Sequence, residues 1–413
     1  MTTSGRMELM APAGNFESLQ AALDNGCDSV YFGVEQLNMR ARATVNFVMD
    51  DLPEIARRCQ AKNVRTYLTL NTIIYDHDLS VVKTLLTQAK AAGITAVIAS
   101  DQAVIAMARS MGIEVHISTQ LNVTNIETVK FYSLFADTIV LSRELSLRQV
   151  KKITEAIEKE QIKGPSGNLV EIEIFGHGAL CMAVSGKCYL SLHSHNSSAN
   201  RGACKQNCRK KYTVIDQESG FEIEIDNEYM MSPKDLCTLD FLDQIVDSGV
   251  KVLKLEGRGR AADYVATVTR VYREAIDAIA EGTYTKERIS VWMETLSTVY
   301  NRGFWSGYYL GQKLGEWSDN PGSNATQKKV YVGKGLHYFP KSGIAEFKIE
   351  AYDIKKGDKL LITGPTTGAQ ELDLDEFFVN DTAAEKATKG DSCTLKVPFR
   401  IRLSDKMYKI VAN

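Results

Sequence analysis

The chain alternates between short apolar runs and amphipathic helical runs, and this alternation constrains its fold more than any other feature. Eight strand-like runs, each followed by a helix or a helix-bearing insert, occupy about 280 residues, the size of a (β/α)8 domain. The expected strands are 8–11, 28–34, 65–74, 95–99, 114–119, 137–142, 170–175 and 250–255. Such alternation predicts an α/β fold built on a closed, TIM-like barrel, with an open doubly wound sheet as the alternative.

The pattern changes towards the C-terminus. We expect the barrel over residues 1–317, with a cysteine-rich insert at 176–230, and a Ser/Asn/Gly-rich linker at 318–327. Beyond the linker, apolar residues alternate with polar ones, as at Ala345, Phe347 and Ile349. This period of two predicts a small antiparallel β-barrel domain over residues 328–413.

The charge balance limits the range of partners. The chain has 49 Lys and Arg against 51 Asp and Glu, a formal net charge of −2, so any contact with RNA must come from local basic patches. No apolar run reaches the length of about 18 residues that a membrane helix needs, so no membrane partner is expected. The first residues lack the apolar core of a signal peptide, and the expected location is the cytoplasm.

Four cysteines share one segment with the spacing C-x6-C-x15-C-x3-C: Cys181, Cys188, Cys204 and Cys208. Thiolates are soft ligands that suit zinc or an iron–sulfur cluster, and the spacing alone leaves both open. Buried, inert thiols are the third interpretation. Cys237, at the start of a helix expected over 236–247, is interpreted as a core residue and as a substitute ligand.

Polar residues cluster where the expected strands end, which is the catalytic side of a (β/α)8 barrel. His177 and Glu256 are candidates for acid–base chemistry, although neither is assigned a definite catalytic role. Arginines at such positions grip carboxylates, and basic runs hold RNA phosphates. The candidates for binding a substrate are Arg40, Arg42, Asn71, Gln120, Arg143 and Arg258, and those for binding RNA are Lys205, Arg209, Lys210 and Lys211.

Several segments resemble the U32 "peptidase" family across essentially the whole chain. They are residues 8–15, 31–33, 40–41, 173–181, 185–191, 200–204 with 208–209, and 254–258. The resemblance implies a [4Fe–4S] cluster on Cys181, Cys188, Cys204 and Cys208. The length and domain plan are similar to those of the branch that hydroxylates tRNA.

That branch implies oxygen-independent 5-hydroxylation of the tRNA wobble uridine, with prephenate as hydroxyl donor. The implied partners are tRNA, a small carboxylate donor, and a partner subunit or a second copy of the chain. Hydroxylation of ribosomal RNA or of a quinone precursor is an alternative. A collagenase-like U32 peptidase is another, although neither G-x-S-x-G nor H-E-x-x-H occurs.

Overall fold

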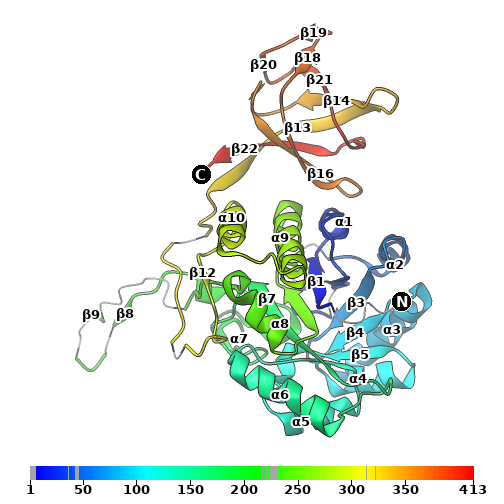
Figure 1. Cartoon of the computed structure of the whole chain (residues 1–413), viewed down its shortest axis with the longest axis vertical. Helices are drawn as coiled ribbons and strands as arrows, with labels where there is room; N and C mark the ends of the chain where they lie inside the picture. The colour runs from blue at the N-terminus through cyan, green and yellow to red at the C-terminus, as the bar shows by residue number, and fades with distance from the viewer. Residues whose placement is uncertain are drawn as a thin grey trace.

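Eight parallel strands close into a barrel, as the alternation predicted (Figure 1). The computed structural model describes residues 6–35, 37–41, 46–215, 217–219, 222–223, 231–312, 314–320 and 322–413. The barrel strands are β1 (Glu8–Ala13), β2 (Ser29–Phe32), β3 (Arg65–Leu70), β4 (Ala96–Ala99), β5 (Glu114–Ile117), β6 (Thr138–Val140), β7 (Glu171–Gly178) and β11 (Val252–Leu255). The barrel is closed because β11 pairs in parallel with both β1 and β7.

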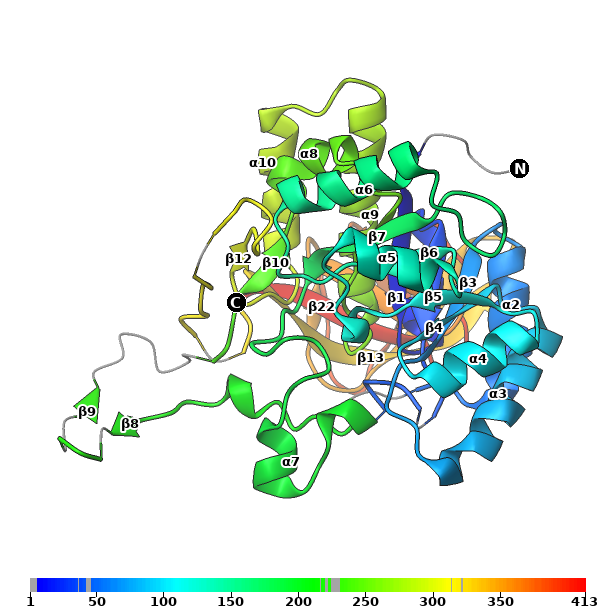
Figure 2. The ribbon, with the colours of Figure 1, turned by 90° about the horizontal axis from the view of Figure 1, so that it is seen from below.

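Helices surround this barrel and bury their apolar faces against it (Figure 2). In α1 (Phe16–Asp24), the Asn15 side chain caps the first turn by accepting a hydrogen bond from the Ser18 N–H, while Leu19 and Leu23 are buried. The other helices are α2 (Leu52–Gln60), α3 (Leu79–Ala92), α4 (Gln102–Ser110), α5 (Ile126–Ser133), α6 (Leu147–Glu160), α8 (Leu242–Asp247), α9 (Ala262–Ala280) and α10 (Lys286–Ser297). Within the described ranges, no helix is both long and apolar enough to cross a membrane.

A long insert follows β7 and carries α7 (Leu190–His195) and the hairpin β8 (Val214–Ile215) and β9 (Glu222–Ile223), which project from the barrel in Figure 2. The chain returns through β10 (Asp235–Cys237), which pairs with β7 and with β12 (Phe304–Trp305). The helix expected over 236–247 is therefore wrong in its first half. The backbone of Leu236 and Cys237 is extended against β7, and α8 begins only at Leu242.

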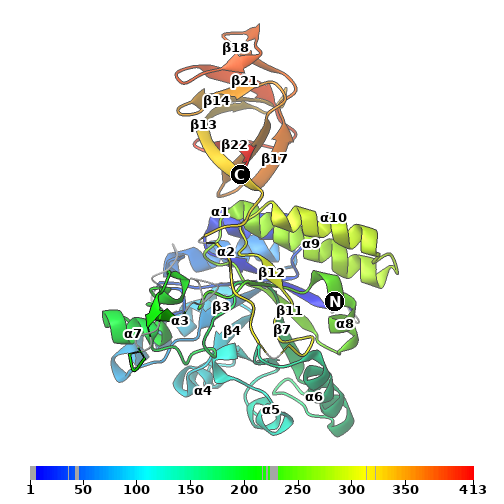
Figure 3. The same cartoon turned by 90° about the vertical axis from the view of Figure 1, so that its left-hand side faces the viewer.

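The C-terminal region folds around a second core that includes Phe347, Phe377 and Met407. Its antiparallel sheet contains β13 (Gln327–Phe339), β14 (Ile344–Ile349), β16 (Lys359–Gly364), β17 (Gly368–Asp373), β18 (Phe377–Val379), β19 (Thr382–Ala383), β21 (Ser392–Lys396) and β22 (Lys406–Ala412), beside the pair β15 (Ile354–Lys355) and β20 (Lys386–Ala387). Figure 3 shows this sheet above α1 and α9, where Lys329 Nζ lies 2.6 Å from Asp263 Oδ1. The sheet therefore docks on the helical shell, away from the mouth of the barrel.

We predict that Leu68→Ala lowers the free energy of unfolding by about 2–5 kcal/mol, because Leu68 is fully buried in β3 and its truncation leaves a cavity. Urea unfolding followed by circular dichroism measures the change. Leu314→Ala, at a side chain that is 83% exposed, is the matched control and should change stability by less than about 0.5 kcal/mol. Equal effects of the two changes would contradict the burial described here.

Candidate functional site

A cavity of about 160 Å³ opens at the C-terminal ends of the barrel strands. Seven of the eight strands, or the loops that follow them, contribute to its wall. The lining includes Tyr31, Thr69, Asn71, Ile98, Ser118, Gln120, Val140, Arg143, Phe175, Lys254, Glu256 and Arg258. The structure therefore gathers Arg40, Asn71, Gln120, Arg143, Glu256 and Arg258, six of the candidates chosen from the sequence, in one place.

The four clustered cysteines line the same cavity. Burial and the neighbouring Cys181, Cys204 and Cys188 raise the pKa of the Cys208 thiol, because four thiolates close together repel one another. Four thiols around one cavity are the donor set that a [4Fe–4S] cluster requires. Among the described residues, no group of three or more Cys, His, Asp or Glu side chains is already gathered tightly enough to hold a metal ion. The cluster remains a prediction.

Arginines surround the first of these cysteines. Desolvation opposes ionisation of Cys181, but the charges of Arg143 and Arg40 and a hydrogen bond from Arg143 outweigh it and hold the thiol pKa below its usual range. Arg143 is itself fixed, since its Nη2 donates to Ser185 Oγ at 3.1 Å and its Nη1 to the Ala179 carbonyl at 3.3 Å. The site therefore favours a thiolate, the form that binds iron.

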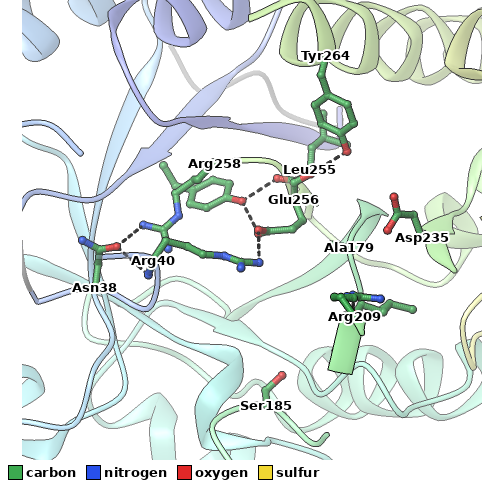
Figure 4. A network of polar contacts seen from close by, with 12 residues as sticks. Asn38, Arg40, Ala179, Ser185, Arg209, Asp235, Leu255, Glu256, Arg258 and Tyr264 are labelled. Atoms are coloured by element: carbon green, nitrogen blue, oxygen red, sulfur yellow. Dashed lines mark hydrogen bonds and ion pairs between the residues drawn. The ribbon is translucent and has the colours of Figure 1, made fainter. Parts of the chain in front are cut away.

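Glu256 belongs to a network of polar contacts that includes Arg40 (Figure 4). The Tyr31 hydroxyl lies 2.9 Å from one carboxylate oxygen, and Arg40 Nη2 donates to the other at 3.1 Å. Burial alone would raise the pKa of this carboxyl, but the charges of Arg40 and Arg258 hold it below its usual range. Glu256 is therefore an ionised carboxylate at neutral pH, the state required of a general base.

Arg258 lies on the opposite wall, buried, with Nη1 donating to Asn38 Oδ1 at 3.1 Å and to Thr69 Oγ1 at 2.9 Å. Its Nε has no hydrogen-bond partner among the described residues. A Cβ on Gly33 would lie 2.8 Å from Nη1 and 2.5 Å from Asn38 Cγ, so a larger residue there would displace both side chains. The guanidinium is thus held by neutral oxygens and retains its capacity to pair with an anion.

Two amide side chains complete the wall. Asn71 Nδ2 donates to Ser118 Oγ at 3.3 Å and to Gln120 Oε1 at 3.2 Å, and Ser118 also bonds to Gln120. Together they offer both donors and acceptors to a ligand.

His177 does not line the cavity. It is buried, its Nδ1 lies 3.3 Å from the Tyr272 hydroxyl, and it packs against Phe304. Burial and, secondarily, Arg260 lower its pKa to about 3. The structure therefore corrects the expectation of a proton donor, because a neutral imidazole behind the cavity wall has a packing role.

The four candidates for binding RNA fall into two groups in the structure. Lys205, Lys210 and Lys211 are exposed, as contacts to RNA require. Arg209 instead donates to the carbonyls of Leu180 and Pro233 at 2.6 and 2.9 Å, and so ties the insert to the barrel. Arg42 lies outside the described residues.

An ion pair at the floor of the cavity was not predicted from the sequence. Lys254 Nζ lies 2.7 Å from Glu173 Oε1 and 4.5 Å from the centre of the Tyr31 ring, and Glu173 Oε2 lies 3.7 Å from His116 Nδ1. Burial opposes the charge on Glu173, but Lys254 outweighs it and lowers the carboxyl pKa. The signal was available, because Lys254 alternates with Val252 on the inward face of a buried strand.

We predict that Glu173→Gln lowers the free energy of unfolding by about 3–5 kcal/mol, because it leaves Lys254 buried without a counter-charge. The double variant Glu173→Leu/Lys254→Met should recover most of the loss in urea unfolding. Glu371→Gln, which breaks an exposed pair with Lys359, is the control and should cost less than about 1 kcal/mol. If the double variant is as unstable as the single one, the buried pair is not the cause.

We also predict that Cys181 of the metal-free protein is alkylated by iodoacetamide with a pH midpoint below the usual thiol value of about 8.5. Arg143→Met should move that midpoint upwards, because a positive charge beside the thiolate is lost. Cys237 is the internal control, since burial raises its pKa to about 12 and it should stay unmodified in the folded protein. Mass spectrometry of the peptides reads both sites, and a Cys181 midpoint above 8.5 would contradict the arginine effect.

Comparison with known proteins places these motifs in a family. The profile of "Peptidase family U32" matches residues 14–319. The chain is 54% identical over 402 residues to a "Collagenase" of Porphyromonas gingivalis, covering 97% of each. It is 30% identical to the "tRNA hydroxylation protein P1" of Bacillus subtilis, covering 87% of this chain and 83% of the relative. It is 34% identical to the "23S rRNA 5-hydroxycytidine C2501 synthase" of Escherichia coli, covering 68% of this chain and 40% of the relative. The chain therefore belongs to peptidase family U32.

Proposed function

We propose that this protein is an iron–sulfur enzyme that hydroxylates the wobble uridine of tRNA at C5, with prephenate as the hydroxyl donor. The observation that carries the proposal is the convergence of four thiols, three arginines and an ionised Glu256 on one cavity. The relatives named for hydroxylation of tRNA and of ribosomal RNA support the reaction class.

Cys181, Cys188, Cys204 and Cys208 would hold a [4Fe–4S] cluster, because they are the thiols on this wall. Exchange of the C5–H bond for C5–OH withdraws two electrons from the base. The donor accepts both electrons, because its C–OH bond breaks and is replaced by a C–H bond, and a bound cluster would supply the electron transfer between the two. Glu256 is the residue suited to accept the C5 proton, since its carboxylate is ionised and partly accessible.

The remaining walls match the two substrates. The amides of Asn71 and Gln120 offer donors and acceptors to the edge of a uracil that leaves its stack. Arg40, Arg143 and Arg258 suit the carboxylates of a prephenate-like donor.

A U32 peptidase is the second candidate, because the relative that is 54% identical is named "Collagenase" and because the Cys181 thiol has a lowered pKa, as nucleophilic cysteines do. A cysteine peptidase also needs a base beside the thiol. Among the described residues that line the cavity, none is a histidine. The geometry therefore favours hydroxylation over peptide cleavage.

Mass spectrometry of tRNA nucleosides tests the proposal. A deletion strain should lack 5-hydroxyuridine derivatives, and the wild-type gene should restore them. Cys181→Ser and Arg258→Met should fail to restore them, whereas Cys237→Ser, at a buried thiol outside the cavity, should restore them. The peptidase would be established instead if deletion leaves the nucleoside profile unchanged and the purified protein cleaves gelatin. The Cys181→Ser variant should then lose that cleavage. If the deletion strain instead loses a hydroxylation of ribosomal RNA or of a quinone precursor, that molecule is the substrate.

A further inference from the structure

A second cavity, of about 130 Å³, lies on the other side of the cysteines. It shares Cys181, Cys204 and Cys208 with the first cavity, and Arg40 and Glu256 border both. The rest of its wall differs, because it contains Arg209, Arg260 and Arg302 and the loop from Gly257 that leads into α9. Four arginines face one carboxylate there, which is the lining of an anion site.

Three of these arginines already have partners. Arg40 is paired with Glu256, Arg302 Nη1 lies 3.0 Å from Asp235 Oδ1, and Arg209 donates to backbone carbonyls. Figure 4 shows Arg209 beside Ala179 and near Asp235. For the guanidinium of Arg260, no hydrogen bond or ion pair is found among the described residues. Arg260 is therefore the cation of this cavity whose donors remain available.

The Arg260 side chain is nevertheless held in place. Its guanidinium carbon lies 3.5 Å from the centre of the Tyr300 ring and 5.8 Å from that of Tyr264. A guanidinium stacked on an aromatic face keeps its N–H edges free for an oxyanion. Because stacking fixes the side chain beforehand, a ligand loses less entropy when it binds.

The surroundings indicate which oxyanion enters. Gln206 and Gly259 line the cavity and are exposed, and the exposed Lys205 and Lys210 flank Gln206 and Arg209 in the sequence. A polyanion that crosses the surface would meet this row of cations before it reached Arg260. The small carboxylate donor would bind in the first cavity, because Arg258 lines that cavity and not the second one.

We propose that the second cavity binds a backbone phosphate of the RNA substrate, with Arg260 as its main ligand, while the target base occupies the first cavity. This inference rests on the proposed function, since it takes RNA as the substrate. Cys181 and the Arg40–Glu256 ion pair, which border both cavities, would then lie between the phosphate and the base.

Binding measurements on the full chain test this site without using catalysis. Arg260→Met should weaken tRNA binding about tenfold and lower the slope of log affinity against log salt by about 0.7–0.9, the loss of one phosphate contact. Arg260→Lys should retain the salt slope and bind with intermediate affinity, because it keeps the charge and loses the planar fork. Uridine 5′-monophosphate should bind the wild type more tightly than uridine, and Arg260→Met should remove that difference.

Arg288→Met is the matched control, because Arg288 also lies over an aromatic ring, 4.8 Å from the centre of Trp292, but lines neither cavity. Wild-type affinity and salt slope in Arg260→Met, with an unchanged melting temperature, would overturn the proposal. Weakened binding of prephenate with unchanged binding of tRNA would assign the cavity to the carboxylate donor and overturn it as well. If tRNA binding depends on Arg260 but deletion of the gene leaves tRNA nucleosides unchanged, the proposed function is refuted while the phosphate site stands.

Discussion

Closure of the barrel by β11 is the constraint on which the site depends. Because β11 pairs with both β1 and β7, the loops after β7 and β11 leave the barrel side by side. Gly178 allows this approach, since it has a φ of +104° and a Cβ there would lie 2.4 Å from the Glu256 carbonyl oxygen. Cys181, three residues further along, consequently faces the same cavity as Glu256. The positive φ of Gly178 thus brings the cysteine insert close to the C-terminal end of the barrel strands.

The charges around Cys181 and Glu256 determine which ligands this end of the barrel favours. Arg143, Arg40 and Arg209 all act on Cys181, and Arg40 and Arg258 act on Glu256, so cations lower the pKa of both a thiol and a carboxyl. Lys254 carries a further positive charge at the floor, balanced by Glu173. Buried cations are unfavourable without anions nearby. An anionic cluster and anionic substrates are the ligands that such an environment favours.

The sequence was sufficient for the parts that follow from local pattern. The strands that close the barrel were predicted correctly, because the alternation of apolar and helical runs determines them. Barrel geometry also brings residues at the strand ends, such as Arg258, to one cavity. The helix over 236–247 was wrong at its start, because pairing with β7 decides the conformation of Cys237 and periodicity cannot report it.

Other features depend on which neighbours the fold supplies. His177 looked like a proton donor from its place near Cys181, but aromatic packing from Tyr272 and Phe304 determines its environment. The Glu173–Lys254 pair joins strands 81 residues apart, and the stacking of Arg260 on Tyr300 joins a barrel loop to the segment after α10. Contacts of this kind appear only once the chain has folded.

The most direct test of the account is the metal content of anaerobically purified protein, measured together with its Mössbauer and electron paramagnetic resonance spectra. We expect about four iron and four sulfide per chain with [4Fe–4S] spectra, since four thiolates complete such a cluster. Loss of the cluster in Cys188→Ala, and its retention in Cys237→Ala, would locate the ligands. Protein that contains one zinc ion, or that contains no metal and leaves Cys181, Cys188, Cys204 and Cys208 open to alkylation, would contradict the cluster.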